Sequence, residues 1–230
     1  MVFKTLPNYL IESNVNDLSE LVFSNSYQIR KKPALFLDRD GVLIKDCHYI
    51  SSVKQVKIEN GAKKLVRFAY IYGFHIVVVS NQSGISRNKI SWNDYFQVTN
   101  KMISLFGNPN PFSAIYANSQ GPNSKKNNWR KPSPNMIIRA SKLFNIDIDK
   151  SILIGDRLTD LQSGLNAGIK TLVHTETGHG KDEKDIVLKN FLKQDISNKF
   201  KFISLRNLGE FPLEFISKIK VNNKKNEKEN

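Results

Sequence analysis

The sequence predicts an α/β domain built on a doubly wound, mainly parallel sheet. Short apolar runs, such as 34–37 and 74–79, alternate along the chain with segments of helical periodicity. Near-continuous apolar strands suit a sheet covered on both faces, and alternating strands and helices are typical of parallel sheets. Several of these strands end in polar residues, and such sheets bind ligands at the carboxyl ends of their strands. We therefore expect a functional site along one edge of the sheet.

Length and composition are those of one globular domain with extensions, since the chain has 230 residues, 40% hydrophobic and 24% charged. A single cysteine, Cys47, excludes an intrachain disulfide and a cysteine-based zinc cluster. No apolar run approaches the roughly 20 residues of a membrane span, and the N-terminus does not have the pattern of a signal peptide. We expect a cytoplasmic protein without a membrane partner, and we expect it to be monomeric.

The formal net charge is +14. A basic surface can attract nucleic acid or steer a small anion into a site, and a general richness in lysine would also produce it. The lysines are scattered apart from the pairs at 31–32 and 125–126 and those of the tail. No platform of interleaved aromatic and basic residues is evident, so the pattern favours a small anion, or no charged partner, over nucleic acid.

Three regions differ in composition. Residues 1–32 form a polar N-terminal extension, with a weak helix expected near Asp17–Phe23. Residues 33–220 form the main domain, which opens with the buried strand at 34–37. Residues 221–230 form a basic and polar tail that we expect to be disordered.

Helix and strand signals then alternate through the main domain. Asn60 can cap a helix with an apolar stripe, and Gly73 can end it. Ser91 and Asp94 form a capping box for a second helix, and Ser133 can cap a third. The remaining expected elements are strands at 74–79, 113–116, 151–154, 171–173 and 200–204, a short helix over 161–167 and a helix at 210–219.

Polar side chains follow several of the predicted strands. In chain order these candidates are Asp38, Asp40, Ser80, Asn81, Arg130, Lys131, Asp156 and Asp160. Asp-Gly at 40–41 is also a turn signal, so this stretch alone is compatible with a hairpin. As a set, the candidates suit phosphoryl transfer, because carboxylates bind Mg²⁺ or attack phosphorus while cations and hydroxyls stabilise the transferring oxygens. No P-loop motif is present, so a P-loop nucleotide enzyme is not indicated.

The same residues carry a resemblance to a known family. FLDRDG at 36–41, VSNQSGISR at 79–87, RKP at 130–132 and GDRLTD at 155–160 resemble the ordered motifs of the haloacid dehalogenase (HAD) superfamily of phosphohydrolases. They are similar to the branch of D-glycero-D-manno-heptose 1,7-bisphosphate and histidinol phosphatases over residues 33–218. The resemblance implies a HAD-like Rossmannoid fold with a minimal cap. It also implies a Mg²⁺-dependent phosphomonoester hydrolase that works through an aspartyl-phosphate.

The resemblance assigns chemical roles to the carboxylates. Asp38 would be the nucleophile, and Asp40 would protonate the leaving alcohol and then activate water. Asp38, the backbone carbonyl of Asp40 and Asp156 would bind Mg²⁺. Asp160 would orient this metal site from outside the ligand set.

The resemblance also assigns binding roles. Ser80 and Lys131 would hold the reacting phosphate. Asn81, Arg87 and Arg130 are candidates for holding the rest of a small phosphorylated metabolite. For Arg87, a solvated loop charge is the alternative.

Two departures from the family pattern are evident. Many members carry a zinc loop with Cys-x-His and Cys-x-Cys before Arg-Lys-Pro, whereas the matching positions here are Asn118, Gln120, Asn127 and Trp129. These residues are no plausible zinc ligand set, so we expect no zinc and another means of holding the loop. Val42 stands where the superfamily usually has threonine, which could alter the surroundings of the nucleophile slightly.

Three hypotheses for function remain. NQSGISR at 81–87 and the spacing of Asp46 and Tyr49 resemble the heptose phosphatases, which implies removal of the C7 phosphate in nucleotide-heptose synthesis for lipopolysaccharide or surface glycans. The second hypothesis is hydrolysis of histidinol phosphate or of a nucleic-acid 3′-phosphate. The third is a non-catalytic binding or assembly protein on a phosphatase fold, with residues 1–32 as a docking arm. The complete catalytic set argues against the third.

Overall fold

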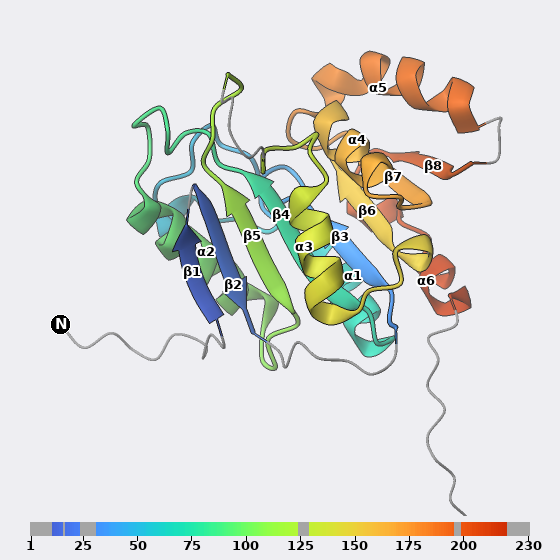
Figure 1. Ribbon diagram of the computed structural model, residues 1–230, viewed down its shortest axis with the longest axis horizontal. Helices are drawn as coiled ribbons and strands as arrows, with labels where there is room; N and C mark the ends of the chain where they lie inside the picture. Colours follow the sequence, from blue (N-terminus) through green and yellow to red (C-terminus); the bar gives the residue numbers. More distant parts are fainter. Residues whose placement is uncertain (1–10, 16, 24–30, 124–128, 196–198, 220–230) are drawn as a thin grey trace, which may run out of the picture.

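An eight-stranded sheet with helices on both faces forms the framework of the molecule (Figure 1). The computed structural model describes residues 11–15, 17–23, 31–123, 129–195 and 199–219. The strands are β1 (Ile11–Val15), β2 (Leu18–Val22), β3 (Ala34–Leu37), β4 (His75–Asn81), β5 (Ala114–Asn118), β6 (Ile152–Gly155), β7 (Thr171–Thr175) and β8 (Lys201–Leu205). Their spatial order is β1-β2-β5-β4-β3-β6-β7-β8.

The sheet from β5 to β8 is parallel throughout, and β2 and β1 add two antiparallel strands beyond β5. The expected doubly wound, mainly parallel sheet is therefore confirmed. Because β3, β4 and β6 run in the same direction, the residues that follow them meet at one edge.

Two apolar layers enclose the sheet. Leu35 and Leu37 of β3 pack into one core, and Ala34 and Phe36 pack into the other, as the alternation of side chains along a strand requires. The helices are α1 (Ala62–Ile71), α2 (Trp92–Phe106), α3 (Asn135–Phe144), α4 (Leu158–Asn166), α5 (Gly180–Asp195) and α6 (Glu214–Lys218). Short 3₁₀ turns lie at Val53–Gln55, Ile148–Lys150 and Leu208–Glu210. Of the helices in the described ranges, none is both long and apolar enough to cross a membrane.

The weak helix expected near Asp17–Phe23 is wrong, because this segment contains β2. All five β2 side chains are buried, and its backbone pairs with β5 from Leu18 opposite Asn118 to Val22 opposite Ala114. Pairing with a distant strand overrides a short local helix signal. The core of the domain therefore extends into the N-terminal extension.

Other differences are at element ends and in two elements that were not predicted, strand β1 and helix α5. Gly61, and not Asn60, is the N-cap of α1, while the Asn60 amide donates to the Asn207 side chain at 2.9 Å. The capping box of Ser91 and Asp94 is confirmed. Helix α5 was not predicted because its sequence is highly charged and lacks a strong apolar stripe. Helix α6 is shorter than the expected 210–219.

Candidate active site

A cavity of about 410 Å³ opens beyond the carboxyl ends of the central strands. Ser80 is buried and is not among the residues that line the cavity. The sequence-predicted residues that line it are Asp38, Asp40, Asn81, Arg87, Arg130, Lys131, Asp156 and Asp160. Residues far apart in the sequence thus meet in one place, as the direction of the strands predicts.

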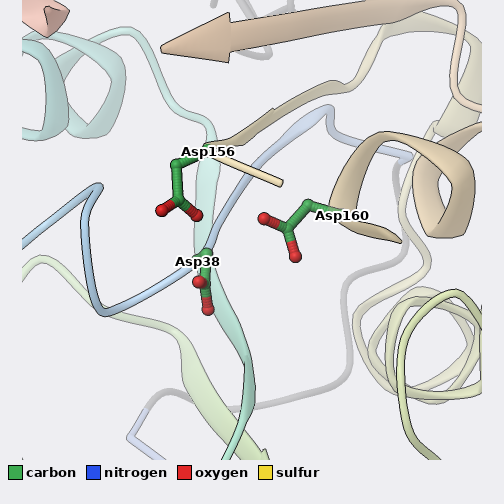
Figure 2. A group of neighbouring side chains, drawn as sticks. All are labelled: Asp38, Asp156 and Asp160. Carbon is green, nitrogen blue, oxygen red and sulfur yellow. The ribbon is translucent and has the colours of Figure 1, made fainter. Parts of the chain in front are cut away.

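Three carboxylates, those of Asp38, Asp156 and Asp160, lie within 4.8 Å of one another (Figure 2). Asp38 follows β3, and its amide donates to the Ile154 carbonyl of β6 at 3.1 Å. Asp156 directly follows β6. Asp160 lies in the first turn of α4, where its carboxylate accepts from the Arg157 amide at 3.0 Å. Two neighbouring strands and one helix start therefore fix the cluster.

Lys131 supplies the cation inside this cluster. Its ammonium is 2.9 Å from Asp38 Oδ1 and 2.6 Å from Asp160 Oδ1, and it donates to the Val79 carbonyl at 2.8 Å. Burial disfavours the charged amine, but the Asp160 and Asp38 carboxylates outweigh burial, so the pKa of Lys131 is raised. Lys131 therefore stays protonated, and one ammonium faces three carboxylates.

The excess of negative charge is reflected in the pKa values of the acids. Burial raises the pKa of Asp38 to about 6, with Lys131 opposing the shift and the Asp160 and Asp40 carboxylates adding to it. Burial, and then Asp160 and Asp38, raise the pKa of Asp156 well above its usual range. A further cation placed among these oxygens would relieve the repulsion.

The surroundings of Asp156 fit a small divalent cation. Its Oδ2 accepts from the His179 amide at 2.8 Å, whereas its buried Oδ1 has no hydrogen-bond partner among the described residues. Gly41 has a φ of +82°, and a Cβ there would come 2.5 Å from Asp156 Oδ2. The backbone thus closes tightly around an oxygen donor, and Mg²⁺ prefers carboxylate and carbonyl oxygens in proteins. The donor set of this cluster therefore fits Mg²⁺.

A second network holds the Asp40 side chain. The Arg39 guanidinium, 1% exposed, donates to both Asp40 oxygens at 3.0 and 2.9 Å. Gln82 Nε2 donates to Asp40 Oδ2 at 2.7 Å, and Gln82 Oε1 accepts from Arg39 at 3.1 Å. Arg39 is itself held by Thr99 and lies 4.9 Å from the centre of the Tyr95 ring. These partners fix Asp40 in one orientation beside Asp38.

Asn81 and Ser80 are engaged with protein groups. The Asn81 amide accepts from the Lys131 amide at 3.0 Å and donates to the Lys131 carbonyl at 3.2 Å. The Ser80 hydroxyl accepts from Gln82 Nε2 at 2.8 Å. Asn81 thus holds the Lys131 backbone and also lines the cavity, and its contact with substrate stays a prediction.

Three guanidinium groups, those of Arg87, Arg130 and Arg157, also line the cavity. Burial, and then the positive charges of Arg157 and Arg87, lower the pKa of Arg130. Arg87 donates to the Tyr49 hydroxyl at 3.1 Å, and Arg157 pairs with Glu183 at 2.9 Å. Mutual repulsion of like charges makes this region favourable for an anion.

A contact between two loops also borders the cavity. His179 Nε2 is 3.0 Å from Asp46 Oδ2, while the His179 amide is the group that holds Asp156. This contact joins the segment after β7 to the segment after β3 at the carboxylate cluster.

Four residues of this site have no role predicted from the sequence: Arg39, Gln82, Arg157 and His179. Arg39, Gln82 and Arg157 lie inside the motifs at 36–41, 79–87 and 155–160, and these motifs were the available signal. His179 lies in no motif, and only the fold brings it to Asp156.

The positions that match the family's zinc ligands hold amide and indole side chains here. Asn118, the last residue of β5, is buried and accepts from the Gln120 amide at 3.3 Å. Trp129 packs against the core that α3 covers. Asn127 lies outside the described residues. The Gln120 carbonyl accepts from Arg130 at 3.2 Å, so protein contacts tie this segment to the cavity.

Comparisons with known proteins agree with this geometry. The family model described as HAD-hydrolase-like matches residues 128–194. A D-glycero-alpha-D-manno-heptose-1,7-bisphosphate 7-phosphatase of Burkholderia mallei is 34% identical over 148 residues, which cover 61% of this chain and 78% of the relative. A D-glycero-beta-D-manno-heptose-1,7-bisphosphate 7-phosphatase of Pasteurella multocida is 32% identical over 178 residues, covering 75% of this chain and 97% of the relative.

A solved structure from Mesorhizobium loti, described as a HAD-like phosphatase, has the same fold. Its TM-score is 0.76 at 24% identity, and the match covers 93% of this chain and 100% of that one. The fold and the relatives together define a HAD-like phosphatase, a phosphoric monoester hydrolase. Within this class, the chain belongs to the family of D-glycero-D-manno-heptose-1,7-bisphosphate 7-phosphatases.

Proposed function

We propose that this enzyme removes the C7 phosphate from D-glycero-D-manno-heptose 1,7-bisphosphate in a Mg²⁺-dependent reaction. The observation that carries the proposal is that two groups of side chains line one cavity, and we call these groups its inner and outer half. The inner half consists of Asp38, Asp40, Lys131, Asp156 and Asp160, and the outer half consists of Arg87, Arg130 and Arg157. A substrate with one phosphate to be cleaved and a second phosphate to be held matches both halves. The names of the relatives support the same substrate.

In the first step, Asp38 acts as the nucleophile. A carboxylate oxygen of Asp38 attacks phosphorus, the bond from phosphorus to the C7 oxygen breaks, and Asp40 donates a proton to that oxygen. With a pKa of about 6, Asp38 is mostly ionised at neutral pH. Arg39 and Gln82 hold Asp40 in place for the proton transfer.

In the second step, the ionised Asp40 takes a proton from water. The water oxygen attacks the phosphorus of the aspartyl-phosphate, and the bond from phosphorus to Asp38 breaks. Inorganic phosphate leaves, and both carboxyl groups return to their starting states.

Asp38, the Asp40 backbone carbonyl and Asp156 would hold Mg²⁺, which is supported by the unpaired buried oxygen of Asp156. When bound, the ion supplies positive charge that offsets the repulsion between the Asp38 carboxylate and the anionic phosphate.

Lys131 is assigned to the oxygens of the transferring phosphoryl group. The phosphate-binding role of Ser80 stays a prediction, since Ser80 is buried outside the residues that line the cavity. Asp160 accepts from Lys131 at 2.6 Å and orients the ammonium, without contacting substrate itself. Asn81 holds the Lys131 backbone from the other side. These contacts support a preorganised cation whose position does not depend on substrate binding.

The substrate places the enzyme in the synthesis of nucleotide-activated heptose for lipopolysaccharide or other surface glycans. We propose that it works as a cytoplasmic monomer on a free metabolite. The single cysteine supports this location.

The test is phosphate release with Mg²⁺ from three substrates: heptose 1,7-bisphosphate, histidinol phosphate and a 3′-phosphorylated oligonucleotide. We expect selective turnover of the heptose bisphosphate that is abolished in Asp38→Asn. Preferred turnover of another member of the panel would refute the substrate while leaving the mechanism intact. Absence of Asp38-dependent release from all three would refute this substrate assignment and favour a binding or assembly role.

A further inference from the structure

The N-terminal strand pair, which consists of β1, Asp17 and β2, lies beside β5 at one edge of the sheet (Figure 1). We infer that this strand pair is a positioning device that holds the Arg130–Lys131 segment at the cavity. Asp17 and Glu20 make the decisive contacts. The inference rests on the proposed function, because it concerns how the outer half recognises the second phosphate.

The first contact leads from Asp17 to Arg130. The Ser119 amide donates to the Asp17 carbonyl at 2.9 Å, and the Ser119 hydroxyl donates to Asp17 Oδ1 at 3.1 Å. The next residue, Gln120, accepts from Arg130 through its carbonyl at 3.2 Å. Ser119 is only 1% exposed, so water competes little for these bonds. The N-terminal strand pair thus fixes the carbonyl that orients the Arg130 guanidinium.

The second contact leads from Glu20 to α3. The Glu20 carboxylate, 3% exposed, accepts from Tyr116 at 2.9 Å and from Arg139 at 3.1 Å through each of its oxygens. Tyr116 lies on β5 and Arg139 on α3, the helix that follows Lys131. A buried carboxylate with paired hydrogen bonds to arginine is geometrically specific. Glu20 therefore connects the two elements on either side of the Arg130–Lys131 segment.

Both contacts come from the same short strand pair and bracket the same segment. Pairing of β2 with β5 alone would stabilise the sheet edge, but the side chains of Asp17 and Glu20 go beyond ladder pairing. Small errors in the position of a binding group are costly, because a displacement of about 1 Å can reduce activity by about a hundredfold. The expected function of the N-terminal strand pair is therefore to keep Arg130 where a second phosphate can contact it.

The first arm of the test is hydrogen–deuterium exchange and needs no substrate. Ser119→Ala removes the hydroxyl contact to Asp17, and Asp17→Asn keeps an acceptor oxygen and tolerates the φ of +66° at this position. Ser113→Ala is the matched control. Ser113 directly precedes β5, and the substitution removes the buried contact between its hydroxyl and His75. We expect faster exchange around Gln120 and Arg130 in Ser119→Ala only. Unchanged exchange in Ser119→Ala would overturn the inference.

The second arm separates positioning from general stability. For Ser119→Ala we expect the KM for heptose 1,7-bisphosphate to rise about tenfold with kcat nearly unchanged, and the KM for heptose 7-phosphate to stay within about twofold. In Asp17→Asn, the KM for heptose 1,7-bisphosphate should stay close to the wild-type value. Equal losses on both substrates, or the same losses in Ser113→Ala, would show a merely structural role and overturn the inference. If the wild type turned over neither substrate, the proposed function would fail, while the exchange arm would still decide whether the N-terminal strand pair holds the segment.

Discussion

The two halves of the cavity are built differently. The inner half is buried, with Asp38 8%, Lys131 2% and Asp156 0% exposed, and Asp38, Asp156 and Asp160 stand at the ends of β3 and β6 and in the first turn of α4. The outer half stands on loops and a helix N-cap, where the Arg157 side chain is 45% exposed. The difference suggests that the sheet fixes the chemistry while exposed segments select the substrate. Loops vary more freely than the scaffold that carries them.

The largest loss of activity is expected from a substitution in the inner half of the cavity. Asp38→Asn removes the nucleophile and should lower kcat at least about a thousandfold with every phosphomonoester. Steady-state phosphate release with Mg²⁺ measures this loss, and circular dichroism controls for folding. Retention of a tenth of the wild-type kcat would mean that another group attacks phosphorus.

The same variant should be more stable than the wild type in Mg²⁺-free buffer. The pKa of Asp38 is raised from 3.8 to about 6 on folding, so its contribution to stability is present below pH 4 and is lost as the pH rises through 6. At pH 7 the ionised carboxylate costs up to about 3 kcal/mol, which Asp38→Asn removes. Urea unfolding at pH 7 and pH 4 checks this, because the difference between the two proteins should shrink at the lower pH. A variant less stable than the wild type at pH 7 would contradict the charge argument.

A smaller effect is expected in the outer half. Arg87→Ala should raise the KM for heptose 1,7-bisphosphate tenfold to about a hundredfold and leave the KM for heptose 7-phosphate within about twofold. The KM of Arg87→Lys for heptose 1,7-bisphosphate should lie between those of Arg87→Ala and the wild type. Tyr49→Phe, which removes only the hydroxyl that accepts from Arg87, is the matched control with little effect. Equal rises in the KM for both substrates would contradict the separate roles of the inner and outer halves.

A positioning effect of about tenfold is expected at Gln82. Gln82→Met removes the amide that donates to Asp40 while keeping the side-chain length, so kcat for the sugar phosphate should fall about tenfold. An aryl phosphate such as p-nitrophenyl phosphate has a leaving group that needs little protonation, and its kcat should change less than about threefold. The same loss with both leaving groups would show that Gln82 does not act through Asp40.

The smallest effect on activity is expected at His75, the first residue of β4, which lies at the opposite end of this strand from the cavity. Burial lowers the pKa of His75 from 6.5 to about 4, so its contribution to stability is present above pH 6.5 and is lost as the pH falls toward 4. Between pH 7 and pH 5 this loss is about 2 kcal/mol. In His75→Gln, urea unfolding should lack this part of the pH dependence, and kcat and KM should be unchanged. A shifted KM for the bisphosphate would connect this region to the outer half.

Part of the inner half could be predicted from the sequence, because two of its residues follow apolar strands directly. Asp38 and Asp156 needed only the strands before them and the rule that parallel strands end at one edge. The roles of Arg39 and Gln82 could not be predicted this way. Arg39 is held by Thr99, and Gln82 reaches Asp40 only after β3 and β4 have paired.

The fold of the N-terminal extension also could not be predicted from local sequence alone. Its local pattern favoured a weak helix near Asp17–Phe23, but β2 is defined by pairing with β5. Helix α5 was missed for the opposite reason, since few of its side chains over residues 180–192 are buried and its charged sequence carries little periodic signal. Where an element depends on distant partners, propensity alone does not define it.

The most direct test of the two-halves account follows heptose 1,7-bisphosphate by ³¹P NMR in the presence of Mg²⁺ and the wild-type enzyme. The account predicts that the C7 phosphate resonance is converted to inorganic phosphate while the C1 phosphate remains, and that neither changes with Asp38→Asn. Loss of the C1 phosphate, or release of both at similar rates, would contradict the assignment of one phosphate to each half.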